Sequence, residues 1–134
     1  LPSTETIMNP DKLDEFTSAY VETLLWSTTD GADGEFSLDE IAGVGDLSDE
    51  ALSRIIQDCN SFQYYAEDVL GDELVRKAEQ AGHDFCLTRN RHGAGFWDGD
   101  WDYISSTAGV ALTELAHTYG QMDAYMAEGK IWVC

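Results

Sequence analysis

The chain has 134 residues, of which 26 are acidic and 7 are basic, and its formal net charge at pH 7 is −19. A chain of this length is expected to form one domain, and a hydrophobic fraction of 43% supplies enough apolar side chains for a core. The charge excludes direct binding to nucleic acid or to an anionic membrane through an extended basic surface, whereas a basic protein partner is compatible with it.

Residues 1–9 lack the positive and apolar regions of a signal or transit peptide, and we expect them to form a flexible segment of a single domain that spans residues 1–134. No stretch approaches the roughly 18 apolar residues of a membrane-spanning helix. The cysteines Cys59, Cys86 and Cys134 form no C-x-x-C pair, so we expect free thiols, Cys59 in the core, no zinc site and no cofactor. These features predict a cytoplasmic protein.

The first part of the chain has the residue spacing of helices. Apolar residues recur at helical spacing over residues 10–27, and Asn9 and Pro10 form a helix-start signal before them. We expect a loop at residues 28–35, followed by a short helical turn at 37–42 that opens with capping-box spacing.

The clearest helical pattern covers residues 49–68, where the apolar side chains fall on one face and Ser48 is the expected N-cap. Gly71 interrupts this pattern. A shorter helix is then expected at residues 72–81, because Gly82 stands where a C-terminal cap residue belongs.

After these helices the pattern changes to that of strands. Residues 84–89 form a strand-like run, residues 90–95 supply turn residues, and Phe96 and Trp97 begin a returning strand. A loop is expected at residues 98–104.

The end of the chain is expected to form a helix and a second hairpin. Apolar residues at helical spacing cover residues 107–119, and Gly120 ends this helix. Residues 121–127 and 130–133 are expected to pair around a Glu-Gly turn. The sequence therefore predicts an α+β fold, in which a helical N-terminal half packs on a small antiparallel sheet in the C-terminal half, built as hairpin, helix and hairpin.

The negative charge is concentrated in the first part of the chain. Residues 1–80 hold 19 acidic and 4 basic residues, a net charge of −15, whereas residues 81–134 hold 7 and 3, a net charge of −4. We expect an acidic surface on the helices, made by carboxylates that lie largely off the apolar stripes. These candidate partner-binding residues are Asp11, Asp14, Glu15, Glu22, Asp46, Asp49, Glu50, Asp58, Glu67, Asp68, Asp72 and Glu73.

Two interpretations of this acidic surface stay open. It could mimic the charge of a nucleic acid, or it could be a solvated surface that prevents aggregation or suits high salt. One DNA strand carries a charge about every 3.4 Å. Residues 49–68 hold five acidic residues over roughly 30 Å of helix, so a single helix is too dilute and a mimic must be assembled from several helices.

The longest motif runs from Asp84 to Asp98 and reads D-F-C-L-T-R-N-R-H-G-A-G-F-W-D. It resembles the D-F-x-L-T-R-N-x-H-G-A-G-F-W-D core of a family of small acidic proteins encoded by bacteriophages and by some bacterial mobile elements, and the resemblance covers most of residues 16–131. It implies a phage-type context and the host cytoplasm, and it brings no activity. The chain departs from the family pattern at Cys86, where the pattern favours Trp, and at Arg91, where it favours Gly.

The same motif holds the richest cluster of polar and aromatic residues. A catalytic or ligand-binding loop would use His92 as a general base and Arg89 as an anion clamp. The alternative is a structural hairpin, in which glycines set the turn and Arg89 pairs with a nearby acid such as Asp84 or Asp98. The candidate residues of this motif loop are Arg89, Asn90, Arg91, His92, Trp97, Asp98 and Trp101.

One acidic loop has part of the spacing of a calcium site. Residues 29–40 place Gly34 at the sixth position of an EF-hand-like loop, although the first side-chain ligand is missing. A polar loop that caps a short helix explains the pattern as well. His83 and His117 have no partner at ligand spacing, and we expect structural roles for them. The weak calcium candidates are Asp33, Glu35, Ser37 and Glu40.

The sequence thus favours a non-enzymatic, phage-type binding protein that acts as a DNA or RNA mimic in counter-defence or host takeover. Its acidic helices would occlude a basic, nucleic-acid-binding cleft on a host protein, and aromatic side chains such as Trp97 and Trp101 would be buried at the contact. One alternative is a small-ligand-binding protein or an enzyme that uses the Arg89–Trp97 loop. A further alternative is a calcium-stabilised interaction module.

Overall fold

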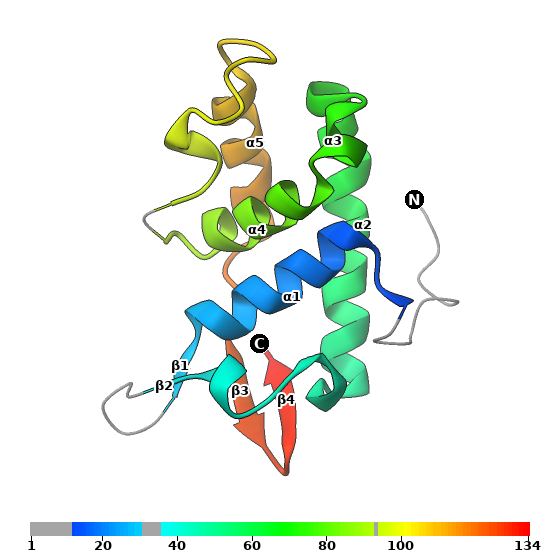
Figure 1. Cartoon of the computed structure of the whole chain (residues 1–134), viewed down its shortest axis with the longest axis vertical. Helices are drawn as coiled ribbons and strands as arrows, with labels where there is room; N and C mark the ends of the chain where they lie inside the picture. Colours follow the sequence, from blue (N-terminus) through cyan, green and yellow to red (C-terminus); the bar gives the residue numbers. More distant parts are fainter. Residues whose placement is uncertain (1–11, 31–35, 93) are drawn as a thin grey trace.

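The computed structural model describes residues 12–30, 36–92 and 94–134, so the expected flexible segment at 1–9 and the helix-start signal after it lie outside the described part. The described part is mostly helical (Figure 1). Its α-helices are α1 (Glu15–Ser27), α2 (Asp49–Leu70), α3 (Glu73–Arg76), α4 (Ala78–Arg89) and α5 (Ala108–His117). Its short 3-10 helices are η2 (Leu38–Glu40), η3 (Val44–Asp46) and η4 (Phe96–Asp98). Its strands are β1 (Thr29–Asp30), β2 (Phe36–Ser37), β3 (Ala124–Ala127) and β4 (Lys130–Val133).

The first two helices begin at capping side chains. α1 begins at Glu15, later than predicted, because Asp14 caps it: its Oδ1 atom accepts a hydrogen bond from the backbone N–H of Thr17 at 2.8 Å. The helix predicted at 49–68 is confirmed as α2, and the hydroxyl of Ser48 accepts from a backbone N–H of its first turn at 3.1 Å. The predicted apolar face of α2 is buried.

The strand predicted at residues 84–89 is wrong, because this segment is the second half of α4. All six of its side chains are buried, so the alternation between a polar and an apolar face that identifies a surface helix is missing. Gly82 does not end a helix either. A Cβ atom there would lie 2.0 Å from the backbone oxygen of Phe16, so glycine lets α4 pack closely on α1. The helix predicted at 72–81 is interrupted at Lys77, between α3 and α4.

The hairpin turn predicted after this segment is the end of α4. The backbone N–H of His92 donates to the oxygen of Leu87 at 3.0 Å, and that of Arg91 donates to the oxygen of Thr88 at 3.1 Å. These are the two bonds of a Schellman motif. Arg91 has a φ of 58°, the left-handed conformation that glycine commonly adopts at this position. Arg91 thus occupies a position at which glycine would be less strained.

The C-terminal half contains one of the two expected hairpins. Phe96 and Trp97 begin η4 and not a returning strand, so the first expected hairpin is wrong. The second is confirmed, since β3 and β4 pair antiparallel. Glu128 and Gly129 between them both have positive φ, at 55° and 76°, as tight hairpin turns of type I′ require. The fold is α+β with little sheet.

The core lies where α1, α2, α4 and α5 meet. In Figure 1, α1 crosses α2 and α4 runs beside α1. The ring centroid of Phe62 on α2 lies 4.2 Å from that of Phe85 on α4 and 5.6 Å from that of Phe96. Cys59 is buried, as expected. The helix predicted at 107–119 is confirmed as α5, which covers this cluster from the other side.

Short strands close the opposite end of the molecule. The beginning of the expected loop at 28–35 is strand β1, which pairs antiparallel with β2 directly after that loop. The β3–β4 hairpin lies near the beginning of α2 (Figure 1), and a parallel bridge from Leu47 to Ile131 joins the two. This arrangement leaves one side of α1 facing the segment of η2 and η3 and the other side facing α4.

Candidate functional site

The motif residue Arg89 lies inside the protein. Its side chain is 0% exposed. Its Nε atom donates to the backbone oxygen of Gly120 at 2.8 Å, and Nη2 donates to that of Tyr119 at 3.0 Å. Its Nη1 atom donates to Oδ2 of Asp58 at 2.8 Å and to the hydroxyl of Tyr20 at 3.1 Å. We call these five residues the Arg89 cluster. A guanidinium has five N–H donors, so the cluster leaves little capacity for an external anion.

The neighbouring motif residues also form internal contacts. The buried carboxylate of Asp84 accepts from Nε1 of the fully buried Trp101 at 2.7 Å, and burial raises the pKa of this carboxyl above its ordinary value of 3.8. The hydroxyl of Thr88 accepts from the backbone N–H of Phe96 at 3.0 Å. A Cβ atom at Gly95 would lie 2.2 Å from that hydroxyl, which requires glycine.

These contacts correct two of the predicted site residues. Arg89 and Trp101 are buried, so neither is available to a ligand or partner at the surface. The structural interpretation of the motif is correct in kind but not in its pairing: Arg89 pairs with Asp58 and not with Asp84 or Asp98. The motif joins α4 to the segments before and after α5.

Two of the remaining motif residues form hydrogen bonds that hold the backbone, and the other three are exposed. The Oδ1 atom of Asn90 accepts from the backbone N–H of Met122 at 2.7 Å, which fixes the chain entering β3. Asp98 accepts from a backbone N–H of its own turn at 3.1 Å. Arg91, His92 and Trp97 are exposed, with Trp97 at 41%. A hollow of about 400 Å³ is lined by Asn90 and His92, but neither Arg89 nor Trp97 lines it.

Most of the carboxylates assigned to the acidic surface are exposed. Asp11 lies outside the described residues, while Asp58 and Glu73 are half-buried. Tyr103 donates to Glu73 at 2.8 Å, and this hydrogen bond and the nearby Arg76 lower the pKa of that carboxyl. The other nine assigned carboxylates are exposed, and these are Asp14, Glu15, Glu22, Asp46, Asp49, Glu50, Glu67, Asp68 and Asp72.

The calcium candidates are only partly within the described chain. Asp33 and Glu35 lie outside it. The expected short turn and capping box are confirmed as η2, where Oε2 of Glu40 accepts from the backbone N–H of Ser37 at 2.8 Å. Among residues 12–30, 36–92 and 94–134, no group of three or more His, Cys, Asp or Glu side chains is placed to hold a metal ion.

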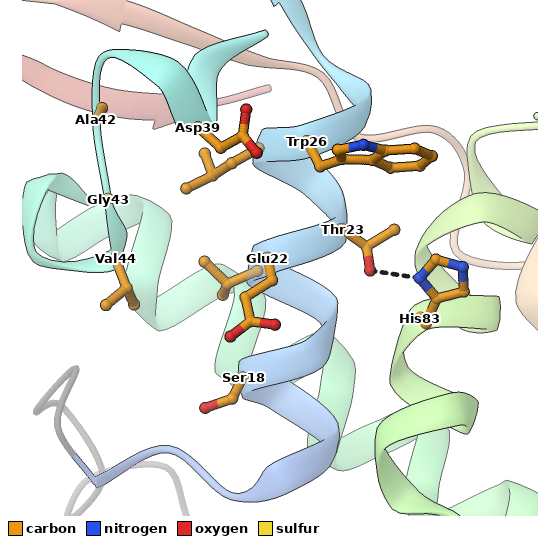
Figure 2. Close-up of a pocket in the computed structure, with 11 residues that line it drawn as sticks. Ser18, Glu22, Thr23, Trp26, Asp39, Ala42, Gly43, Val44 and His83 are labelled. Atoms are coloured by element: carbon orange, nitrogen blue, oxygen red, sulfur yellow. Dashed lines mark hydrogen bonds between the residues drawn. The ribbon is translucent and has the colours of Figure 1, made fainter.

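The structure contains a hollow that the sequence analysis did not identify. It has a volume of about 600 Å³ and lies along the outer side of α1, between the η2–η3 segment and α4. We call it the α1 groove. Its wall includes apolar side chains together with the charged, hydroxyl and aromatic groups drawn in Figure 2. Its lining includes Glu22, Thr23 and Trp26 on α1, Asp39 on η2, and His83 on α4.

Helix geometry places Glu22 and Trp26 together on the groove side of α1. They are four residues apart, so their side chains are neighbours on the helix surface. Trp26 is 58% exposed, although most of α1 is buried. Asp39 lies on the opposite wall, on η2 (Figure 2). No residue in the described ranges forms a hydrogen bond or an ion pair with the carboxylate of Glu22.

His83 is held in one orientation under Trp26. The hydroxyl of Thr23 donates its one hydrogen to the backbone oxygen of Ala19 at 2.7 Å, so it accepts from Nδ1 of His83 at 2.9 Å. The neutral imidazole therefore carries its hydrogen on Nδ1 and has an acceptor at Nε2. Figure 2 shows this ring below the indole of Trp26, and the two ring centroids are 6.3 Å apart.

Sequence reasoning missed the α1 groove because no motif marks it. His83 was expected to be structural, and its bond to Thr23 agrees with that, but the ring also lines the groove. The one available signal was Trp26, a large aromatic residue beside an acid one helical turn earlier. Such a pair on a helix surface is visible only when the neighbouring elements are placed.

Comparisons of the chain with protein-family models, with curated proteins and with solved structures found no match. No helix in the described ranges is long and apolar enough to cross a membrane.

Proposed function

We propose that this chain is a non-enzymatic, phage-type acidic binding protein that occludes the basic, nucleic-acid-binding cleft of a host protein. Its carboxylates would take the places of nucleic-acid phosphates, so the partner could not hold nucleic acid at the same time. This inhibitor would work in the host cytoplasm, in counter-defence or host takeover.

The observation that carries the proposal is the lack of internal neutralisation. The chain has a net charge of −19. Within the described ranges, ion pairs join Arg76 to Glu73 and Arg89 to Asp58, and no others occur. Asp84 is the one acid that the structure describes as buried. Most of the negative charge on the described residues therefore acts on the solvent, where it attracts a basic surface and accelerates association.

The arrangement of the helices supports a surface assembled from more than one element. α2 carries exposed acids near both ends, while Asp58 in its middle is engaged by Arg89. The beginning of α1 meets α2 in this middle part, since Gln63 donates to Oδ2 of Asp14 at 3.2 Å. Asp14 and Glu15 are exposed there and add charge where α2 has less. Two helices thus contribute carboxylates to this surface.

The alternative that uses the Arg89–Trp97 loop is less well supported. The guanidinium of Arg89 is consumed by internal hydrogen bonds, and the hollow beside His92 includes neither Arg89 nor Trp97. The calcium-stabilised module has Ser37 and Glu40 among its described candidates, and Glu40 serves as a helix cap. These observations favour the binding protein.

The proposal is tested by affinity capture on the immobilised chain from a bacterial lysate, followed by elution with duplex DNA, with RNA or with salt. We expect retained proteins that have basic nucleic-acid-binding surfaces and that either nucleic acid or salt displaces. Retained proteins that ignore salt and are not displaced by nucleic acid would contradict the proposal.

A pair of charge variants makes this test specific. The double variant Glu67→Lys and Asp68→Lys reverses exposed charges near the end of α2, where the helix dipole tolerates cations. It should slow association with the captured partner by about tenfold. The control reverses Glu114 and Asp123, which change the net charge equally but are not among the assigned carboxylates. Equal slowing in both variants would show a non-specific charge effect.

A further inference from the structure

We propose that the α1 groove is a binding site for an arginine side chain of the basic partner. This inference rests on the proposed function, because the partner's arginines are the groups that otherwise hold nucleic-acid phosphates. The carboxylates would attract the partner over a long range, and this site would add a specific short-range contact. The partner's guanidinium would lie against the indole of Trp26 and reach the carboxylates of Glu22 and Asp39.

Trp26 supplies a platform for a flat cation. Its indole is 58% exposed, lines the groove and extends from α1 toward the His83 side, as Figure 2 shows. An indole face attracts a cation through its quadrupole, and a guanidinium can also stack on it. An exposed Trp on a mostly buried helix leaves apolar area in water, and a stacked arginine would cover it.

The carboxylates come from two different elements. Glu22 lies one helical turn before Trp26 on α1, and Asp39 lies across the hollow on η2. The exposed Glu22 has no hydrogen-bond partner among the described side chains, whereas Asp39 accepts from the hydroxyl of Ser37. A guanidinium has N–H donors on several edges, so it can address acceptors on both walls. A lysine ammonium is a point charge and lacks this geometry.

The remaining wall also suits a donor-rich cation. The bond from Nδ1 of His83 to Thr23 leaves Nε2 as an acceptor in the neutral ring. Val21 and Val44 contribute apolar lining, against which the methylenes of an arginine can pack. The volume of about 600 Å³ accommodates the whole side chain and part of the backbone that carries it.

The test is a titration of the ¹⁵N-labelled full chain followed through the indole N–H resonances of its tryptophans. The probe is an acetylated and amidated Gly-Arg-Gly peptide, and matched peptides carry lysine or the uncharged isostere citrulline. The resonance of Trp26 is assigned with Trp26→Phe. We expect a saturable shift of this resonance with arginine, a weaker affinity with lysine and no saturable shift with citrulline.

Variants and matched controls identify the groups that bind. Trp26→Ala should weaken arginine binding about five- to tenfold, as expected for a cation on an aromatic face. Glu22→Gln should weaken it roughly threefold. The controls Trp97→Ala and Glu114→Gln remove an exposed Trp and an exposed Glu that do not line the α1 groove, and they should leave the affinity unchanged. Equal binding of citrulline, or an unchanged affinity in Trp26→Ala, would overturn the inference.

The outcomes also separate this inference from the proposed function. If the captured partner binds Trp26→Ala as tightly as the original chain but loses affinity for the α2 charge variant, the groove is not the anchor and the acidic binding protein stands. If the arginine peptide binds the groove but no nucleic-acid-binding partner is captured, the site stands and the proposed function is wrong.

Discussion

The Arg89 cluster and the α1 groove both depend on α4, but they use polar groups in opposite ways. Near the end of α4, Arg89 donates four hydrogen bonds to neighbours within the chain. Earlier on the same helix, His83 helps to line an open hollow in which Glu22 has no described partner and Trp26 is largely exposed. The polar groups of the first region are bonded within the chain, whereas those of the second face an open hollow.

This difference shows that the longest motif of the chain and the α1 groove are formed by different side chains. Gly95, Arg89 and Thr88 of the motif are constrained because each fills a close-packed or hydrogen-bonded position. These constraints come from packing and hydrogen bonds within the chain and involve no ligand. The α1 groove needs only a few side chains that face the same space, and these come from three separate elements. It therefore produces no pattern along the chain.

Removal of the buried guanidinium of Arg89 should cause the largest loss of stability. Arg89→Ala leaves the carboxylate of Asp58 and the oxygens of Tyr119 and Gly120 without their donor, so we expect a loss of about 3 kcal/mol or more in the free energy of unfolding. Urea denaturation followed by circular dichroism measures it. If this variant does not fold, Arg89→Lys retains the charge without the fork and should lose less. A loss under about 1 kcal/mol in Arg89→Ala would show that the cluster does not hold the fold together.

A substitution that disturbs the contact between α4 and α1 should cause the next largest loss of stability. A Cβ atom in Gly82→Ala would meet the backbone oxygen of Phe16 at 2.0 Å, and backbone cannot move aside cheaply. We expect a loss of about 2–3 kcal/mol from the forced separation of the helices. Gly43→Ala is the control, since nothing lies within 4 Å of its Cβ position, and it should lose little. Equal stability of the two variants would contradict the close packing.

The buried acid of the motif should give a pH-dependent effect. Burial raises the pKa of Asp84 above 3.8, so folding favours its protonated form, although the bond from Trp101 opposes this shift. Its ionisation therefore costs stability at neutral pH, and that cost disappears as the pH falls below the unfolded pKa of about 4. Asp84→Asn keeps an acceptor and does not titrate. The stability of the original chain relative to this variant should rise between pH 7 and pH 3.5, measured by urea denaturation at each pH. A constant difference would contradict the assignment.

The left-handed residue at the end of α4 should give the smallest change in stability. Arg91 has a φ of 58°, which costs an ordinary residue about 1 kcal/mol relative to glycine. Arg91→Gly should therefore raise the free energy of unfolding by about 0.5–1 kcal/mol, as thermal denaturation can measure. A decrease would show that the exposed Arg91 side chain makes a stabilising contact of its own.

The sequence predicted the elements that have one buried face or a clear cap. α2 and α5 repeat apolar residues at helical spacing, η2 has a capping box, and the last hairpin has a glycine in its turn. The segment 84–89 was misassigned because every side chain in it is buried, and the role of Gly82 depends on α1, which is distant in the sequence. Long-range packing decided both.

The candidate site was less predictable than the fold. The sequence indicated that the carboxylates are exposed, but it could not show that Arg89 takes Asp58 out of the acidic surface. It also placed Trp101 at a contact surface, whereas the bond to Asp84 holds that side chain in the core. Exposure and pairing arise from tertiary structure, and neither follows from the composition of a segment.

The most direct test of this account is a single titration series with the arginine peptide on three proteins: the original chain, His92→Ala and Trp26→Ala. His92 is an exposed residue of the motif, and Trp26 is the exposed aromatic residue of the α1 groove. If the motif serves the fold and the groove serves binding, His92→Ala keeps the original affinity and Trp26→Ala loses most of it. An affinity that is lost in His92→Ala and retained in Trp26→Ala would contradict the account.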